Sequence, residues 1–277
     1  MARSRSSTER IALDPTALGR RFRRSLRAQE VLLGGIVHEY LRPSLVKMYR
    51  HAGFDFIFIE NEHTTFLGPE FSDFVQCARD NGLPVISKVG QLERAEVARC
   101  LEAGVSAIQL PRTESREQLS ELIDTMKFAP QGTRAGAPCF GNVDYVAPGD
   151  DAAWLRKANQ STSVVAHIET PRGYENAEEI VSTPHLDAVY VGPYDFSIAM
   201  EAPGDYNHPR VRKAMKRILE LCLEHDVAFG TTASDPRAAA RWVKNGCRFF
   251  EVIDELTLIS HGACRIVDDY KRAGTIA

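Results

Sequence analysis

The sequence predicts an α/β protein in which residues 19–277 form a single (β/α)8 barrel, the TIM barrel. From Val31 onward, eight short apolar runs alternate with segments of helical periodicity, and most connecting loops are short. The runs are rich in β-branched residues and apolar on both faces, which is typical of strands buried in a parallel sheet. A doubly wound sheet is the alternative fold, but it usually carries a glycine-rich nucleotide loop, and the sequence has no GxGxxG motif.

The segment before the first strand divides at residue 18. Residues 1–18 are polar and without pattern, so we predict a disordered tail. A first helix follows, which we interpret as solvated or as facing another subunit. We prefer this interpretation to an RNA-binding arm, because Phe22 is the only aromatic residue among its basic residues. Those residues are Arg20, Arg21, Arg23, Arg24 and Arg27.

The first half of the chain contains four strand-helix units. The helix of the first unit begins at Pro43, and the helices of the first three units end at Gly53, Gly82 and Gly104. Proline at the start and glycine at the end are common helix signals. The predicted strands are Val31–Val37, Phe54–Ile59, Leu83–Lys88 and Val105–Leu110.

A passage rich in glycine and proline, Ala129–Asp150, separates the two halves of the chain. Loops of this length in a compact domain are usually functional or mobile. In the second half, apolar residues from Val211 to Leu223 recur at helical spacing, and another helix ends at Gly246. The predicted strands are Val164–Ile168, Leu186–Gly192, Val227–Thr232 and Phe249–Ile253.

The composition excludes several classes of protein. A net charge of −3 argues against a general nucleic-acid-binding protein. The sequence has no apolar stretch long enough for a membrane span and no signal peptide core. The six cysteines form no CxxC pair, which argues against a disulfide framework or a zinc site. We therefore predict a cytoplasmic protein without nucleic-acid or membrane partners.

Two of the predicted strands end directly at a carboxylate. Val164–Ile168 is followed by Glu169, and the run that ends at Tyr194 is followed by Asp195. The carboxyl ends of parallel strands open onto the cleft of such folds, so both acids are placed to bind one cation there. The alternative is that each acid caps the following helix. Oxygen ligands without a thiolate favour Mg²⁺ or Mn²⁺.

The other strand ends add acids, bases and cations that suit a small anionic substrate. A 2-oxo acid would chelate the metal, which would stabilise the enolate formed beside the carbonyl. His63 is the candidate general base, because imidazole titrates near neutral pH; a purely structural role is the alternative. The strand-end residues are His38, Glu60 to His63, Lys88, Pro111, Arg112, Glu169, Asp195, Thr231, Thr232, Asp254 and Glu255.

Three segments resemble the HpcH/HpaI family of class II pyruvate aldolases. They are the run from Phe54 to His63, the motif Ile168-Glu169-Thr170, and the motif from Gly192 to Ser197, which contains Gly-Pro-Tyr-Asp. The resemblance extends from about Val31 to His261. Members of the family include 4-hydroxy-2-oxoheptanedioate aldolase and 2-dehydro-3-deoxyglucarate aldolase.

The resemblance implies a TIM-barrel lyase that cleaves or forms 4-hydroxy-2-oxo acids from a 2-oxo acid and an aldehyde. It implies that Glu169 and Asp195 bind the metal and that His63 is the acid/base residue. Gly192 and Pro193 would shape the pyruvate pocket, and we add Pro111, at the end of the fourth strand, to the substrate-binding residues. It also implies a homo-oligomer, a hexamer built as a trimer of dimers that exchange their last helix, here near residues 264–270.

Four positions depart from the family pattern, and one of them is Glu102, where the family often has an aspartate. Lys88 stands where the family has the arginine that holds the pyruvate oxygens, and a lysine lacks the planar fork that grips two oxygens. Glu60 replaces an aspartate expected to orient the imidazole of His63. His167 replaces a glutamine; we assign it to the substrate pocket, and as a third metal ligand it would favour Mn²⁺, Co²⁺ or Zn²⁺. We count Glu60 and Lys88 among the catalytic residues, and Lys88 also among the substrate-binding residues.

Three other functions are compatible with a barrel of this kind. Lys88 would form a Schiff base in a metal-independent aldolase, but Glu169 and Asp195 would then have no purpose. An acyl-CoA lyase, of the citramalyl-CoA or malyl-CoA type, would use the long loop over a larger substrate, although no strongly basic patch for the CoA phosphates is visible in the sequence. A barrel that binds a small acid without turning it over is the third.

Overall fold

The computed structural model describes residues 14–28, 30–64, 66, 68–233 and 235–274. We predicted a disordered tail over residues 1–18, and residues 1–13 of it lie outside the described residues. The first helix, α1 (Ala17–Arg27), begins two residues before the predicted domain boundary. One face of α1 is not solvated as predicted, because Phe22 and Leu26 are buried against the barrel interior.

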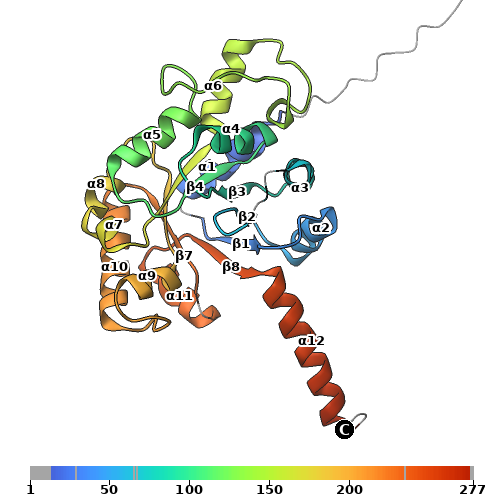
Figure 1. Ribbon diagram of the computed structural model, residues 1–277, viewed down its shortest axis with the longest axis vertical. Coiled ribbons are helices and arrows are strands. Elements are labelled where there is room, and N and C mark those ends of the chain that lie inside the picture. Colours follow the sequence, from blue (N-terminus) through green and yellow to red (C-terminus); the bar gives the residue numbers. More distant parts are fainter. Residues whose placement is uncertain (1–13, 29, 65, 67, 234, 275–277) are drawn as a thin grey trace, which may run out of the picture.

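The predicted TIM barrel is confirmed. Eight parallel strands pair in chain order and close on themselves through β1 and β8 (Figure 1). Each strand overlaps the run predicted for it, and the observed and predicted strands differ only at their ends. The strands are β1 (Leu32–Val37), β2 (Phe56–Glu60), β3 (Val85–Lys88), β4 (Ala107–Leu110), β5 (Ser163–His167), β6 (Ala188–Val191), β7 (Ala228–Thr231) and β8 (Phe249–Asp254).

Helices cover the outside of the sheet (Figure 1). Several are short and were not predicted, namely α7 (Pro171–Glu175), α8 (Ala177–Val181), α9 (Pro193–Ala199) and the 3₁₀ turn Gly141–Val143 in the long loop. The longer ones are α2 (Pro43–Ala52), α3 (Pro69–Asp80), α4 (Arg94–Ala103), α5 (Arg116–Met126), α6 (Asp151–Ser161), α10 (Pro209–Glu224), α11 (Pro236–Asn245) and α12 (Glu255–Arg272).

The lower interior of the barrel is filled by aromatic rings that need glycine on the neighbouring strand. Phe56 and Phe249 are fully buried there and contact each other edge to face. A Cβ atom on Gly34 would come within 2.2 Å of the Phe56 ring, and one on Gly230 within 2.3 Å of the Phe249 ring. This packing closes the interior, so the cleft is restricted to the opposite end of the barrel.

The last helix, α12, leaves the barrel and projects away from it (Figure 1). Only Glu255, at its start, is buried; the Glu255 carboxylate accepts backbone N–H groups of His38, Glu39 and Tyr40. Beyond that anchor the helix exposes six large apolar side chains: Leu256, Leu258, Ile259, Ile266, Val267 and Tyr270. Within the described residues, none of the helices combines the length and apolarity needed to span a membrane.

We expect Gly230→Ala to destabilise the protein by about 1–3 kcal/mol, because the added methyl overlaps the Phe249 ring in a filled interior. Urea unfolding measures this change. Gly149→Ala is the matched control, since a Cβ at Gly149 meets nothing within 4 Å. Equal stability of the two variants would contradict the packing described above.

Candidate active site

A cleft of about 230 Å³ opens at the carboxyl ends of the strands. Its lining includes several of the predicted site residues: Glu60, Lys88, His167, Gly192, Pro193 and Asp195. Aromatic rings fill the interior below this level. At the carboxyl ends of the strands polar side chains take their place, because these residues face the mouth of the barrel. The fold therefore brings residues from β2, β3, β5, β6 and α9 together in one place.

Lys88, at the end of β3, is buried between two carboxylates. Its Nζ lies 3.1 Å from Glu60 Oε2 and 2.5 Å from Glu62 Oε2, and Lys88 is 4% exposed. Burial alone would lower the pKa of Lys88, but the charges of Glu60, Glu62 and Glu169 raise it above its ordinary value. The ammonium therefore stays protonated at neutral pH, which disfavours Lys88 as a Schiff-base nucleophile.

Glu60 does not orient the imidazole of His63, contrary to the interpretation from the sequence. Its Oε1 accepts the backbone N–H groups of Glu62 and His63, at 2.7 and 3.3 Å, because the chain turns sharply after β2. The ring lies beside Glu62 instead, with Nε2 3.8 Å from Glu62 Oε2. The His63 side chain is 70% exposed and is not part of the cleft lining.

Glu169, two residues beyond β5, is a buried carboxylate. Its oxygen Oε2 receives no hydrogen bond from the nearest side chain, His167. Its Oε1 accepts the backbone N–H of Arg112 at 2.7 Å. Its Oε2 lies 3.2 Å from His167 Nε2, which already accepts the N–H of Gly192 at 3.1 Å. Burial raises the pKa of Glu169 to about 7, although Lys88 and Arg112 act to lower it.

His167, at the end of β5, is a neutral ring fixed in place. Burial and the neighbouring Lys88 charge hold the pKa of His167 well below its ordinary value. With Nε2 as acceptor, the proton sits on Nδ1, which is buried without a partner among the described residues. Because the Nε2 lone pair is directed at Gly192, the expectation that His167 is a third metal ligand does not match this arrangement.

Gly192 and Pro193 form the start of α9 and line the cleft. A Cβ atom on Gly192 would come within 2.7 Å of His167 Nε2, so this close approach requires glycine. Asp195 follows in the first turn of α9 and is exposed. Its charge is close enough to Glu169 to raise the pKa of Glu169. Pro111 is buried and lies outside the cleft lining.

Glu251 was missed by the sequence analysis. It lies in the middle of β8, is 3% exposed, and has one carboxyl oxygen without a hydrogen-bond partner in the described structure. The Thr232 hydroxyl donates to the Glu251 backbone oxygen, and Tyr190 contacts Thr232 at 2.6 Å. Burial raises the pKa of Glu251 to about 8, so the carboxyl is largely protonated at neutral pH. An acid inside an otherwise apolar strand was the available signal.

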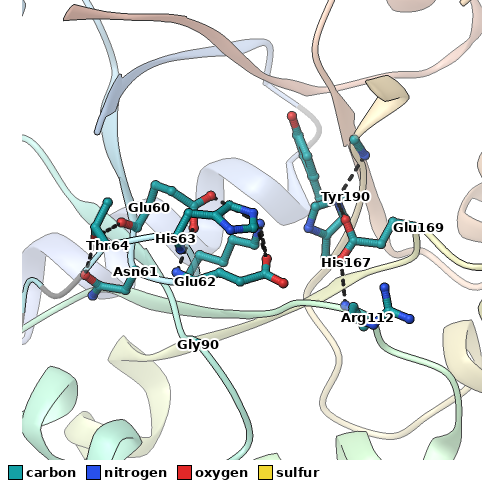
Figure 2. A network of polar contacts seen from close by, with 12 residues as sticks. Glu60, Asn61, Glu62, His63, Thr64, Gly90, Arg112, His167, Glu169 and Tyr190 are labelled. Atoms are coloured by element: carbon teal, nitrogen blue, oxygen red, sulfur yellow. Dashed lines mark hydrogen bonds and ion pairs between the residues drawn. The ribbon is translucent and has the colours of Figure 1, made fainter. Parts of the chain in front are cut away.

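Two groups of side chains have the chemistry of a metal site. The first is Glu60, Glu62 and His63, and the second includes Glu169. Figure 2 shows Glu169, with the neighbouring His167, apart from the first group. The ligand atoms of Glu60, Glu62 and His63 lie within 4.8 Å of one another. However, the Lys88 ammonium occupies that group and would repel a cation. The buried Glu169 carboxylate with the nearby Asp195 fits a divalent cation better, since both supply hard oxygen ligands.

Comparison with known proteins agrees with this architecture. The family model described as HpcH/HpaI aldolase/citrate lyase matches residues 39–261. The hydroxypyruvate/pyruvate aldolase of Delftia acidovorans is 27% identical over 90% of this chain and 92% of its own. The HpcH/HpaI aldolase of Desulfitobacterium hafniense superposes with a TM-score of 0.85 at 24% identity, covering 90% of this chain and 95% of that one. CitE of Mycobacterium tuberculosis, solved with magnesium and pyruvate, gives a TM-score of 0.55 at 18% identity, covering 83% and 87%.

We expect the stability of the protein to fall as the pH rises from about 5 to 8. In this window the folded protein keeps the proton on Glu251 that the unfolded chain releases, so each pH unit lowers the free energy of unfolding by up to about 1.4 kcal/mol. Glu251→Gln removes this contribution, and urea unfolding with chelator present at several pH values measures it.

The matched control is Glu121→Gln, on the exposed side of α5. The stability difference between wild type and Glu251→Gln should change with pH, whereas that between wild type and Glu121→Gln should not. Parallel pH profiles for wild type and Glu251→Gln would show that Glu251 is ionised in the folded protein throughout this range.

Proposed function

The chain belongs to the HpcH/HpaI aldolase/citrate lyase family, and we propose that it cleaves and forms 4-hydroxy-2-oxo acids through a pyruvate-type enolate. As a member of this family it is a carbon–carbon lyase. The observation that carries the proposal is the buried Glu169 carboxylate beside Asp195 and His167 at the ends of β5 and β6. Its small-molecule partners would be a 2-oxo acid and an aldehyde.

We propose that Glu169 and Asp195 hold a divalent cation, Mg²⁺ or Mn²⁺. When bound, the cation supplies the positive charge that stabilises the enolate oxygen. The charge of the cleft supports a bound cation. Lys88 is the only lysine or arginine among the described lining residues of the cleft, and it is already paired with Glu60 and Glu62. An anionic 2-oxo acid would otherwise enter a site with excess negative charge.

The residues of the chain would bind the substrate and move its protons. Gly192 and Pro193 shape the pocket beside His167, and Lys88 presents its charge to the 2-oxo acid from β3. In cleavage, the 4-hydroxyl group loses its proton to a base, the bond between C3 and C4 breaks, and its electrons remain on the pyruvate fragment. His63 would be the base, oriented by Glu62 rather than by Glu60.

Two alternatives from the sequence analysis remain open to test. An acyl-CoA lyase would use the same enolate chemistry on a thioester. A barrel that binds a small acid without turnover would bind the metal but form no enolate.

The oligomeric state and location are also proposals. We propose a homo-oligomer, because the apolar side chains of α12 need a partner surface to cover them. The resemblance to the family implies that it is a hexamer, arranged as a trimer of dimers. The exchanged segment would be α12, which contains residues 264–270. A cytoplasmic location stays a prediction.

We expect the metal-loaded protein to exchange the methyl protons of pyruvate with deuterated water. Proton NMR follows the loss of the methyl signal. Exchange should disappear with chelator and fall at least a hundredfold in Asp195→Asn and in His63→Ala, because these changes remove a metal ligand and the base. His51→Ala, an exposed histidine at the end of α2, is the control and should exchange normally.

Absence of exchange with pyruvate or another 2-oxo acid, at several divalent metals, would reject the lyase. Metal binding without exchange would then favour the non-catalytic alternative. Normal exchange in His63→Ala would leave the lyase in place but remove His63 from its mechanism.

We expect Ile259→Asp combined with Ile266→Asp to reduce the mass of the particle in solution toward the 30.8 kDa of one chain. Two charges on the apolar side of α12 would make its burial unfavourable. Light scattering after size exclusion measures the mass. Ser260→Asp combined with His261→Asp adds the same charges at polar positions of α12 and should keep the assembly; a wild-type monomer would refute the proposed oligomer.

A further inference from the structure

A groove of about 740 Å³ lies between α10 and α11. The groove and the active-site cleft share three lining residues, Pro193, Tyr206 and Thr232. The groove and the cleft are therefore adjacent. The groove is about three times as large as the cleft.

The groove is lined by cations. Four basic side chains, Arg212, Lys213 and Lys216 of α10 and Arg241 of α11, line it, against one carboxylate, Asp205. Lys216 pairs with Glu220 at 3.6 Å, whereas Arg212, Lys213 and Arg241 have no ion pair among the described residues. Cations gathered in a concave site without carboxylate partners attract an anion.

Two further features favour an anionic ligand. Pro209, Arg212 and Lys213 belong to the first turns of α10, which has no acidic residue in its first turn, so the positive end of the helix adds to the positive charge of the groove. Trp242 of α11 lines the same groove and offers a flat apolar surface. A single carboxylate would leave most of these cations unused, whereas a phosphate accepts several at once.

We propose that the groove between α10 and α11 binds a phosphate-bearing portion of the substrate, whose reacting end lies in the cleft. This inference rests on the proposed lyase function and names its substrate class. The phosphate would come from one of two sources, the nucleotide part of a CoA thioester or the phosphate of a short phosphorylated aldehyde. Both sources place an anion on Arg212, Lys213 and Arg241.

Tryptophan fluorescence tests the proposal without turnover. The chain has two tryptophans, and the other, Trp154, is buried against Phe128. In Trp154→Phe, the remaining signal comes from Trp242. We expect saturable quenching by CoA, by glyceraldehyde 3-phosphate, or by both, and none by the phosphate-free analogues pantetheine and glyceraldehyde at the same concentrations.

Variants then test the cations. In the Trp154→Phe background, Arg212→Gln with Arg241→Gln should weaken phosphate binding by about tenfold or more, and Arg212→Lys with Arg241→Lys should restore most of it. Arg210→Gln with Arg217→Gln is the control, because these residues of α10 pair with Glu201 and Glu178 and do not line the groove. Binding should also weaken with added salt.

Quenching by CoA alone would support a thioester substrate, and quenching by glyceraldehyde 3-phosphate alone would support a phosphorylated aldehyde. No saturable quenching by either, equal binding of the phosphate-free analogues, or equal loss in the control variant would overturn the proposal. Failure here is distinct from failure of the lyase, because methyl exchange of pyruvate does not involve the groove.

Discussion

The buried ion pair network of Lys88 is the interaction on which the mouth of this barrel depends. Lys88 holds Glu60 at the end of β2 and Glu62 in the following loop, and its charge also acts on Glu169. Removing one member of such a network would leave an uncompensated buried charge. The remaining acids are accommodated differently: Glu169 by the Arg112 N–H, and Glu251 by keeping its proton.

The two ends of the barrel interior are filled by different kinds of side chain. Aromatic rings fill the lower interior, where Gly34 and Gly230 make room for them, and titratable groups occupy the level above. The lower layer is closely packed, so polar side chains such as Glu251 and His167 have no route to bulk water except through the cleft. A ligand in that cleft therefore meets groups whose protonation is set by burial and by one another.

Much of the fold was predictable because strand burial and glycine helix ends are local signals. The eight strands and the acids at the ends of β5 and β6 follow from runs of apolar residues and what comes directly after them. Contacts between distant segments were not predictable. The pairing of Lys88 with Glu62, the neutral His167 and the proton on Glu251 depend on side-chain directions across the barrel. The sequence also showed no basic patch, because Arg212 and Arg241 meet only when α10 and α11 pack together.

The central claim is that the cation binds at Glu169 and Asp195 rather than at Glu60, Glu62 and His63, where Lys88 already supplies positive charge. The most direct test is diffraction at the manganese absorption edge from crystals soaked with Mn²⁺ and pyruvate. We expect one anomalous peak in contact with carboxylate oxygens of Glu169 and Asp195, with pyruvate beside it in the cleft. A peak within the Glu60, Glu62 and His63 group, with Lys88 displaced, would contradict the claim.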